Sequence, residues 1–215
     1  MALSKVNFNS LNLTPTASKT VVFNSNNNGL EAGDVGGSMV LISTQTASSS
    51  ATISFTSGID STYKEYIFKF IDIHPATDSA NFTFNMSADS GSNYNVTKTT
   101  TFFQAYHRED GHTDYQVSYS TGRDLAQSTD FQIIARETGN DNDQSANGTL
   151  HLFDPSNTTF VKHFICTSHN AQSQNYSNPQ FIGGYGNTTS AVDAVQFKFS
   201  SGNIDSGTIK LYGIT

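Results

Sequence analysis

Cysteine is almost absent from this sequence, in which Cys166 is the only one among 215 residues. A single cysteine can form no disulfide within the chain and cannot build a cysteine cluster for a metal ion. Tryptophan is absent as well, so the large aromatic side chains are 16 phenylalanines and 9 tyrosines. The fold must therefore be held together by side-chain packing and by backbone hydrogen bonds.

Charged residues are scarce too, at 13% of the chain, and they leave a net charge of −7 with a pI of about 5.1. An average globular protein has about 25% charged residues. Because nucleic acids and anionic membranes are bound by clustered basic residues, the composition predicts neither partner. A neutral surface rich in Asn, Ser and Thr instead suits a protein that is packed in many copies, because identical neighbours repel one another little.

Long apolar runs and common catalytic motifs are also missing. No stretch approaches the ~18 apolar residues of a membrane-spanning helix, and Met1–Lys5 leads into polar residues rather than into the apolar part of a secretion signal. The motifs of phosphate loops, dinucleotide folds, HExxH proteases and GxSxG esterases do not occur. We therefore expect no enzymatic activity, although the two carboxylates of a glycosidase have no fixed spacing.

The first 37 residues differ from the rest of the chain. Their apolar residues, including Val6, Phe8, Leu11 and Leu13, are scattered, and glycines interrupt the second half of the segment repeatedly. Such residues cannot close a core by themselves, so the segment is expected to be disordered or to lie along another surface. We predict that residues 1–37 form an extended arm that binds a partner through these four side chains.

Residues 38–215 have the pattern of β-strands. Short runs of alternating apolar and polar residues are separated by Gly, Asn, Asp and Pro, which is typical of sandwiches and barrels. We predict an all-β, two-sheet antiparallel β-sandwich, jelly-roll-like, with eight or more strands whose order the sequence does not reveal. The expected strands are Met39–Thr44, Ala51–Thr56, Glu65–His74, Asn81–Ser87, Thr101–His107, Tyr115–Ser120, Phe131–Ala135, Gly148–Asp154, Thr159–Ser168, Ala191–Ser200 and Thr208–Ile214.

Two of these strands allow their buried faces to be predicted. In the strand Asn81–Ser87, the alternation directs Thr83 and Asn85 outward and the Phe and Met residues beside them inward. The segment Glu65–His74 is largely apolar on both faces, with Ile73 on the face opposite Phe68, which predicts a central strand covered on each side. The core is expected to contain Phe68, Phe84, Phe164 and Phe197.

The richest polar cluster is Glu137–Ser145, in which Asp141, Asp143 and Ser145 occupy alternate positions, as oxygen ligands of a calcium loop do. The glycine at the sixth position and the glutamate at the twelfth position of such a loop are missing. We interpret the cluster as a solvated turn, with a calcium loop as the alternative, and expect no essential metal or organic cofactor.

Histidines suggest two further places where a ligand could bind. The segment His107–His112 (HREDGH) combines two histidines with an arginine and two acids, which could bind a metal, but we interpret it as an exposed hairpin tip. His151 and His163 lie on neighbouring predicted strands, where they could face one another across a hairpin. We expect them to be ordinary histidines of a sheet.

Tyrosines are the remaining candidates for a binding surface, because carbohydrates bind β-sandwiches on aromatic platforms. Four of them lie near segments rich in Gly and Asn, where a ring could be exposed. We favour packing at the strand ends over a platform. The four residues are Tyr94, Tyr106, Tyr176 and Tyr185.

Three segments carry a resemblance to a known family, namely Phe55–His74 (FTSGIDSTYKEYIFKFIDIH), Gly148–Phe164 (GTLHLFDPSNTTFVKHF) and Gly183–Ile214, which ends in DAVQFKFSSGNIDSGTIKLYGI. In order and spacing, residues 51–215 resemble jelly-roll-like proteins encoded by marine tailed phages. The resemblance implies a virion component, namely a capsid decoration protein, a tail-associated protein or the head of a short fibre. It implies no catalytic residues.

We therefore expect a non-enzymatic structural protein of the virion that packs against other virion proteins and against copies of itself. Neighbouring copies around a closed symmetry axis would cover exposed sheet edges, and analogy with other phage jelly rolls gives a homotrimer. The alternative is a domain at a tail or fibre tip that binds a host glycan. A phage depolymerase that cleaves such a glycan is a third hypothesis.

Overall fold

The computed structural model describes residues 19–23, 26, 28–34 and 38–215. The chain separates into two units, Met1–Ser38 and Met39–Thr215. The described part of the first unit is a hairpin in which β1 (Lys19–Phe23) pairs antiparallel with β2 (Leu30–Asp34).

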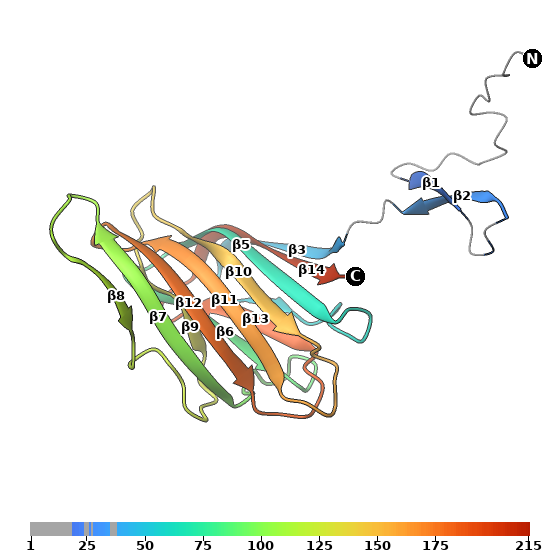
Figure 1. Cartoon of the computed structure of the whole chain (residues 1–215). Helices are drawn as coiled ribbons and strands as arrows, with labels where there is room; N and C mark the ends of the chain where they lie inside the picture. The colour runs from blue at the N-terminus through green and yellow to red at the C-terminus, as the bar shows by residue number, and fades with distance from the viewer. Residues whose placement is uncertain (1–18, 24–25, 27, 35–37) are drawn as a thin grey trace, which may run out of the picture. The chain divides into compact units, whose positions relative to one another are not determined.

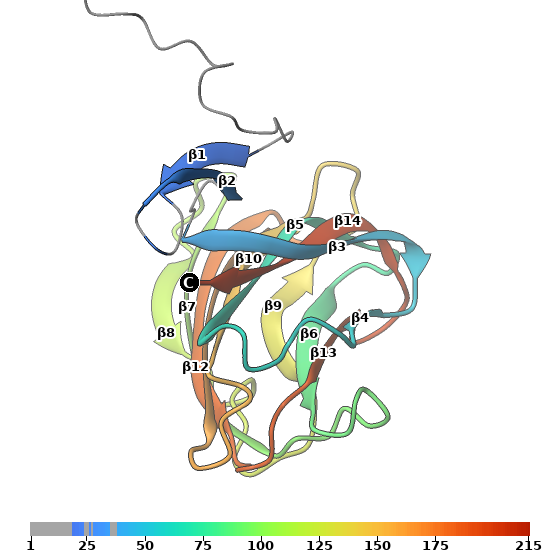
Figure 2. The same ribbon diagram turned by 90° about the vertical axis from the view of Figure 1, so that its right-hand side faces the viewer.

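The second unit is a sandwich of two antiparallel sheets, which lie one behind the other in Figure 1 and side by side in Figure 2. The larger sheet has eight strands in the order β3-β14-β5-β10-β11-β12-β7-β8, and the smaller has four in the order β4-β13-β6-β9. The prediction of an all-β antiparallel sandwich is thus confirmed, and the described residues contain no helix. The strands are β3 (Met39–Ser50), β4 (Ile53–Phe55), β5 (Glu65–Pro75), β6 (Ala80–Ser87), β7 (Lys98–Arg108), β8 (Tyr115–Tyr119), β9 (Gln132–Thr138), β10 (Ala146–Phe153), β11 (Lys162–Ala171), β12 (Tyr176–Gly186), β13 (Ala194–Phe199) and β14 (Ile204–Ile214).

The core between the two sheets is built mainly from phenylalanines. Phe68, Phe84, Phe164 and Phe197 are all buried, as the alternation predicts. The rings of Phe84 and Phe164 meet edge to face across the two sheets, with centroids 5.0 Å apart, a geometry that aromatic pairs prefer. Cys166 is fully buried in the same core, and burial raises the pKa of its thiol.

Strand β5 differs from the prediction on one point. Ile73 is fully buried and shares the core face with Phe68, whereas the alternation places the two residues on opposite faces. The reason is an irregularity at Asp72, which has a φ of 52° and lies where the pairing with both neighbouring strands shifts. An extra residue in a strand reverses the alternation beyond it. On the face opposite Phe68, Ile67 is buried and Ile71 is exposed, so the prediction that β5 is covered on both faces holds at Ile67 and fails at Ile71.

A second difference concerns Asn85 and Thr83 on β6, which the alternation directs into solvent. Both are buried. The amide of Asn85 donates to the backbone oxygens of Tyr94 and Thr129, at 2.6 and 2.9 Å, and its Oδ1 accepts a hydrogen bond from Lys98 Nζ at 2.6 Å. Connecting segments therefore cover this side of the smaller sheet, which alternation alone cannot reveal.

Lys98 is fully buried beside Asn85, and its Nζ also donates to the backbone oxygen of Val96 at 2.7 Å. Burial lowers the pKa of Lys98 from its ordinary value of 10.5 to about 7, and the charge of Asp130 opposes this shift only in part. Between these two values the unfolded chain binds a proton that the folded chain does not, so folding becomes more favourable as the pH rises. Below pH 7 both states are protonated and the slope vanishes.

We expect the free energy of unfolding to rise between pH 7.5 and 9.5 by up to ~1.4 kcal/mol per pH unit more in the wild type than in Lys98→Met. Urea denaturation at several pH values measures both slopes. Comparing slopes separates the titration of Lys98 from any change in stability that the substitution causes at all pH values. Parallel curves for the two proteins would show that Lys98 stays charged in the fold.

Within the sandwich, β12 is the strand that the sequence pattern does not predict. Its sequence contains Pro179 and several glycines, which normally indicate a loop. Pro179 falls at a break in the pairing with β7, where no backbone N–H is needed. Gly184 lies so close to β7 that a Cβ atom would be 2.6 Å from the backbone oxygen of Thr99. The glycines and the proline that suggest a loop are therefore needed here because β12 is packed tightly between two neighbouring strands.

Candidate functional site

The outer face of the larger sheet carries an unusual group of apolar side chains. Consecutive Phe102 and Phe103 on β7 point to opposite faces, so Phe102 is buried whereas Phe103 is 45% exposed. Phe103 pairs in register with Tyr119 on one side and with Phe181 on the other. The rings of Phe103 and Phe181 are stacked, with centroids 5.0 Å apart and an interplanar angle of 11°.

We call this surface the outer patch. Val117 on the edge strand β8 and Ile165 on β11 extend it, and both are more than half exposed. The smaller sheet covers only the opposite face, as the two views in Figures 1 and 2 show. Contiguous exposed apolar residues on a soluble protein mark a site of interaction. The outer patch consists of Phe103, Val117, Tyr119, Ile165 and Phe181.

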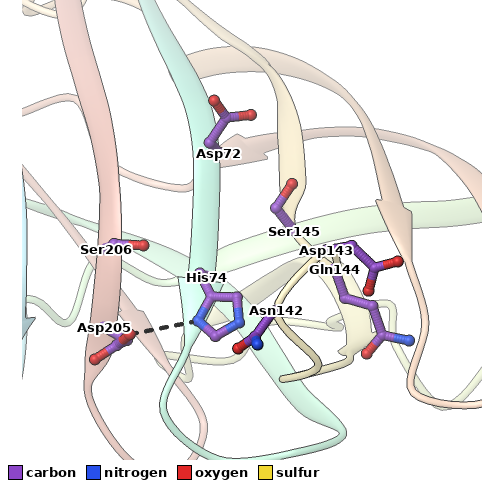
Figure 3. A pocket seen from close by; sticks show the side chains of 8 residues that line it. All are labelled: Asp72, His74, Asn142, Asp143, Gln144, Ser145, Asp205 and Ser206. Atoms are coloured by element: carbon purple, nitrogen blue, oxygen red, sulfur yellow. Dashed lines mark ion pairs between the residues drawn. The ribbon is translucent and has the colours of Figure 1, made fainter.

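The turn with the calcium-like spacing lies in an open cleft of about 390 Å³ at one end of the sandwich (Figure 3). His74 on β5 stands at the centre of this cleft, with its Nε2 3.2 Å from the backbone oxygen of Asp141 and its Nδ1 3.6 Å from Asp205 Oδ2. Asp143 and Asp72 line the same cleft from the turn and from β5.

This turn is held by protein groups. Gln144 is buried, and its amide donates to the backbone oxygen of Gln172 at 3.1 Å and to Asn175 Oδ1 at 2.9 Å. Asp141 and Asp143 are exposed. Within the part of the chain that the structure describes, no three His, Cys, Asp or Glu side chains are placed so that they could hold a metal ion.

The other histidine candidates are also placed by the structure. Residues 109–114 connect β7 to β8, so HREDGH does form the tip of a hairpin, where Arg108 and Asp110 make an ion pair at 3.3 Å. His151 and His163 do not face one another, because Leu152 is the residue that pairs with Phe164 and His151 pairs with Ile165. His151 instead contacts Glu65, at 2.6 Å between Nδ1 and Oε1.

All four tyrosines singled out in the sequence are half-buried. Two of them meet although they are far apart in the chain: the rings of Tyr106 on β7 and Tyr176 on β12 pack edge to face with centroids 5.8 Å apart. The exposed tyrosines are Tyr115 and Tyr119 on β8, neither of which the sequence pattern indicates. They are exposed because β8 is an edge strand. The sequence does not reveal the order of the strands, so this exposure could not be predicted.

Tyr106 and Tyr176 line a second, smaller cleft of about 270 Å³. Arg136 and Glu137 on β9 also line it, and Glu137 accepts hydrogen bonds from Arg136 at 2.5 Å and from Arg123 at 2.8 Å. Burial and the neighbouring Arg136 charge lower the pKa of Arg123. No sequence motif indicates this cleft, because its residues come from separate strands and loops.

The predicted partner-binding residues Val6, Phe8, Leu11 and Leu13 lie outside the described residues, and their role stays a prediction. In the described part of the chain, no helix is long and apolar enough to cross a membrane. Comparisons with models of protein families, with curated proteins and with solved structures found no match.

Proposed function

We propose that this chain is a non-enzymatic structural protein of a bacteriophage virion, either a capsid decoration protein or a tail- or fibre-associated protein. It acts by packing against other virion proteins and against copies of itself in a homotrimer. The proposal rests on the resemblance of residues 51–215 to marine phage jelly-roll-like proteins and, for the mode of action, on the outer patch.

The outer patch supports packing because its five residues are uncharged and three of them are aromatic, with the carboxylate of Asp124, which accepts the Tyr119 hydroxyl at 2.6 Å, beside it. Tyrosine and phenylalanine are enriched at the centres of protein interfaces, whereas charged residues are depleted there. The stacked rings of Phe103 and Phe181 are held by the sheet in one arrangement, so little conformational entropy is lost when a partner covers them. Low charge over the whole chain limits repulsion between neighbouring copies.

We assign the outer patch one occupant, the N-terminal arm of a neighbouring copy. Residues 1–18 contain a single charged residue, Lys5, and their apolar pairs Val6/Phe8 and Leu11/Leu13 have the two-residue spacing of an extended strand. Because positions 8 and 11 are three residues apart, the two pairs lie on opposite faces of such a strand, and one of the two pairs would lie on the patch. Ordering an arm costs roughly 1–2 kcal/mol per residue, which apolar burial against a partner can offset.

A shortened chain that begins at Ser38 tests the role of the arm. We expect the full chain to form trimers and to decorate particles that lack it, and we expect the shortened chain to lose at least about tenfold in both affinities. Light scattering measures the oligomer, and co-sedimentation measures binding to particles. Circular dichroism of the shortened chain controls for folding. Full occupancy by the shortened chain would contradict the proposed attachment.

A further inference from the structure

The cleft between β9 and the β7–β12 part of the larger sheet, which we call the inter-sheet cleft, contains polar groups that the protein itself does not satisfy. Among the described residues, Gln172 Nε2 and Arg136 Nε are buried without a hydrogen-bond partner, and both residues line this cleft. Gln172 as a whole is only 5% exposed. Buried donors without a partner are rare in native proteins, and a water molecule or a ligand that reaches them can accept the bond.

Acceptors and aromatic rings line the same cleft as these donors. Asp114 and Glu137 bring carboxylates to the wall of the cleft, and Gln104 brings a buried amide. Tyr176 donates its hydroxyl to Asp114 at 2.5 Å, which fixes the carboxylate beside the ring. Tyr106 packs edge to face against Tyr176, so two rings at an angle of 82° form one side of the cleft.

We propose that the inter-sheet cleft binds a neutral sugar, as a free monosaccharide unit or as the end of a glycan chain. Sugar hydroxyls both donate and accept hydrogen bonds, and planar carboxylate, amide and guanidinium groups match them in pairs. The C–H faces of a sugar ring pack on aromatic rings. A volume of about 270 Å³ is at the small end of ligand sites and fits one ring better than a long chain.

The charges in the cleft exclude two other ligand classes. Two carboxylates, those of Asp114 and Glu137, line the cleft, and the two guanidinium groups of Arg136 and Arg123 balance their charge. An acidic sugar or a phosphate would find both guanidinium groups already paired with Glu137. A cation is disfavoured because Arg136 and Arg123 already neutralise Glu137. A neutral molecule with many hydroxyls is the class that meets no uncompensated charge.

The test uses the full chain and a panel of methyl glycosides of glucose, galactose, mannose and N-acetylglucosamine, with glucuronic acid as the acidic comparison. NMR chemical shifts of the side-chain amides of Gln104 and Gln172 report binding at the cleft. We expect at least one neutral glycoside to shift them at concentrations up to ~10 mM, tenfold above the ~1 mM dissociation constant of a weak site.

Asp114→Ala and Asp110→Ala form a matched pair of variants. Both residues are exposed in the connection between β7 and β8, but only Asp114 lines the inter-sheet cleft. We expect Asp114→Ala to weaken binding at least tenfold and Asp110→Ala to leave it unchanged. Asp114→Asn keeps the shape of the side chain, and circular dichroism shows whether each variant is folded.

Three results would overturn the proposal. The first is that no neutral glycoside shifts the amide signals. The second is that only glucuronic acid does so, which would assign the cleft to anions. The third is that Asp114→Ala and Asp110→Ala bind equally well, which would place the sugar elsewhere. These measurements use the isolated protein, so their outcome is independent of where the chain sits on a particle.

Discussion

Replacing Phe197 by alanine is expected to lower the free energy of unfolding by about 3–5 kcal/mol, the range for truncating a buried phenylalanine. Phe197 on β13 contacts four other phenylalanines, of which Phe68 belongs to the opposite sheet, with ring centroids 5.5 Å apart. Removing the Phe197 ring would leave a cavity between the two sheets, within the cluster of phenylalanines that joins them. Guanidinium denaturation measures the effect, together with a fall in melting temperature of about 10 °C. The remaining contacts of Phe197 are with Phe55, Phe82 and Phe84.

The matched control is Phe160→Ala, in the connection between β10 and β11. Phe160 is 67% exposed, so we expect its replacement to change stability by less than about 0.5 kcal/mol. Both substitutions remove the same benzyl group, and only the burial differs. A loss below about 2 kcal/mol for Phe197→Ala, or equal losses for the two variants, would contradict the assignment of the core.

The double variant Phe103→Ser/Phe181→Ser is expected to weaken self-association about 100-fold or more. Aromatic side chains at the centre of an interface commonly contribute about 2 kcal/mol or more each, and 1.4 kcal/mol corresponds to a factor of ten. The two residues are partly exposed on the outer face, so the sandwich itself should remain folded. Analytical ultracentrifugation over a range of concentrations measures the change.

Two further proteins make this result specific. Phe160→Ser removes an exposed phenylalanine outside the outer patch and should leave self-association unchanged. Combining the double variant with removal of residues 1–37 should cost little more than either change alone, because both remove the same contact. Additive losses would show that the arm and the outer patch bind different partners, and that the occupant assigned to the patch is wrong.

The fold class could be predicted from the sequence because alternation and burial agree in most strands. Runs such as the one around Phe84 place one face in the core whatever the order of the strands. The prediction failed where the backbone departs from regular geometry or where another segment covers a strand. Asp72 reverses the alternation before Ile73, and connecting segments bury Asn85.

The candidate sites were harder to predict from the sequence than the fold class, because they depend on the order of the strands. Phe103 and Phe181 lie in segments far apart in the sequence and become neighbours only because β12 pairs with β7. The pattern of β12 indicates a loop, so the pairing could not be foreseen. Consecutive Phe102 and Phe103 did contain one usable signal, since in a strand one of the two must face outward.

Electron microscopy of intact particles at side-chain resolution tests the central claim most directly. We expect density for this chain on the virion, arranged as trimers in which the outer patch of each copy is covered by residues 1–37 of its neighbour. Isolated copies that do not touch one another, an outer patch open to solvent, or particles without the chain would contradict the proposed function.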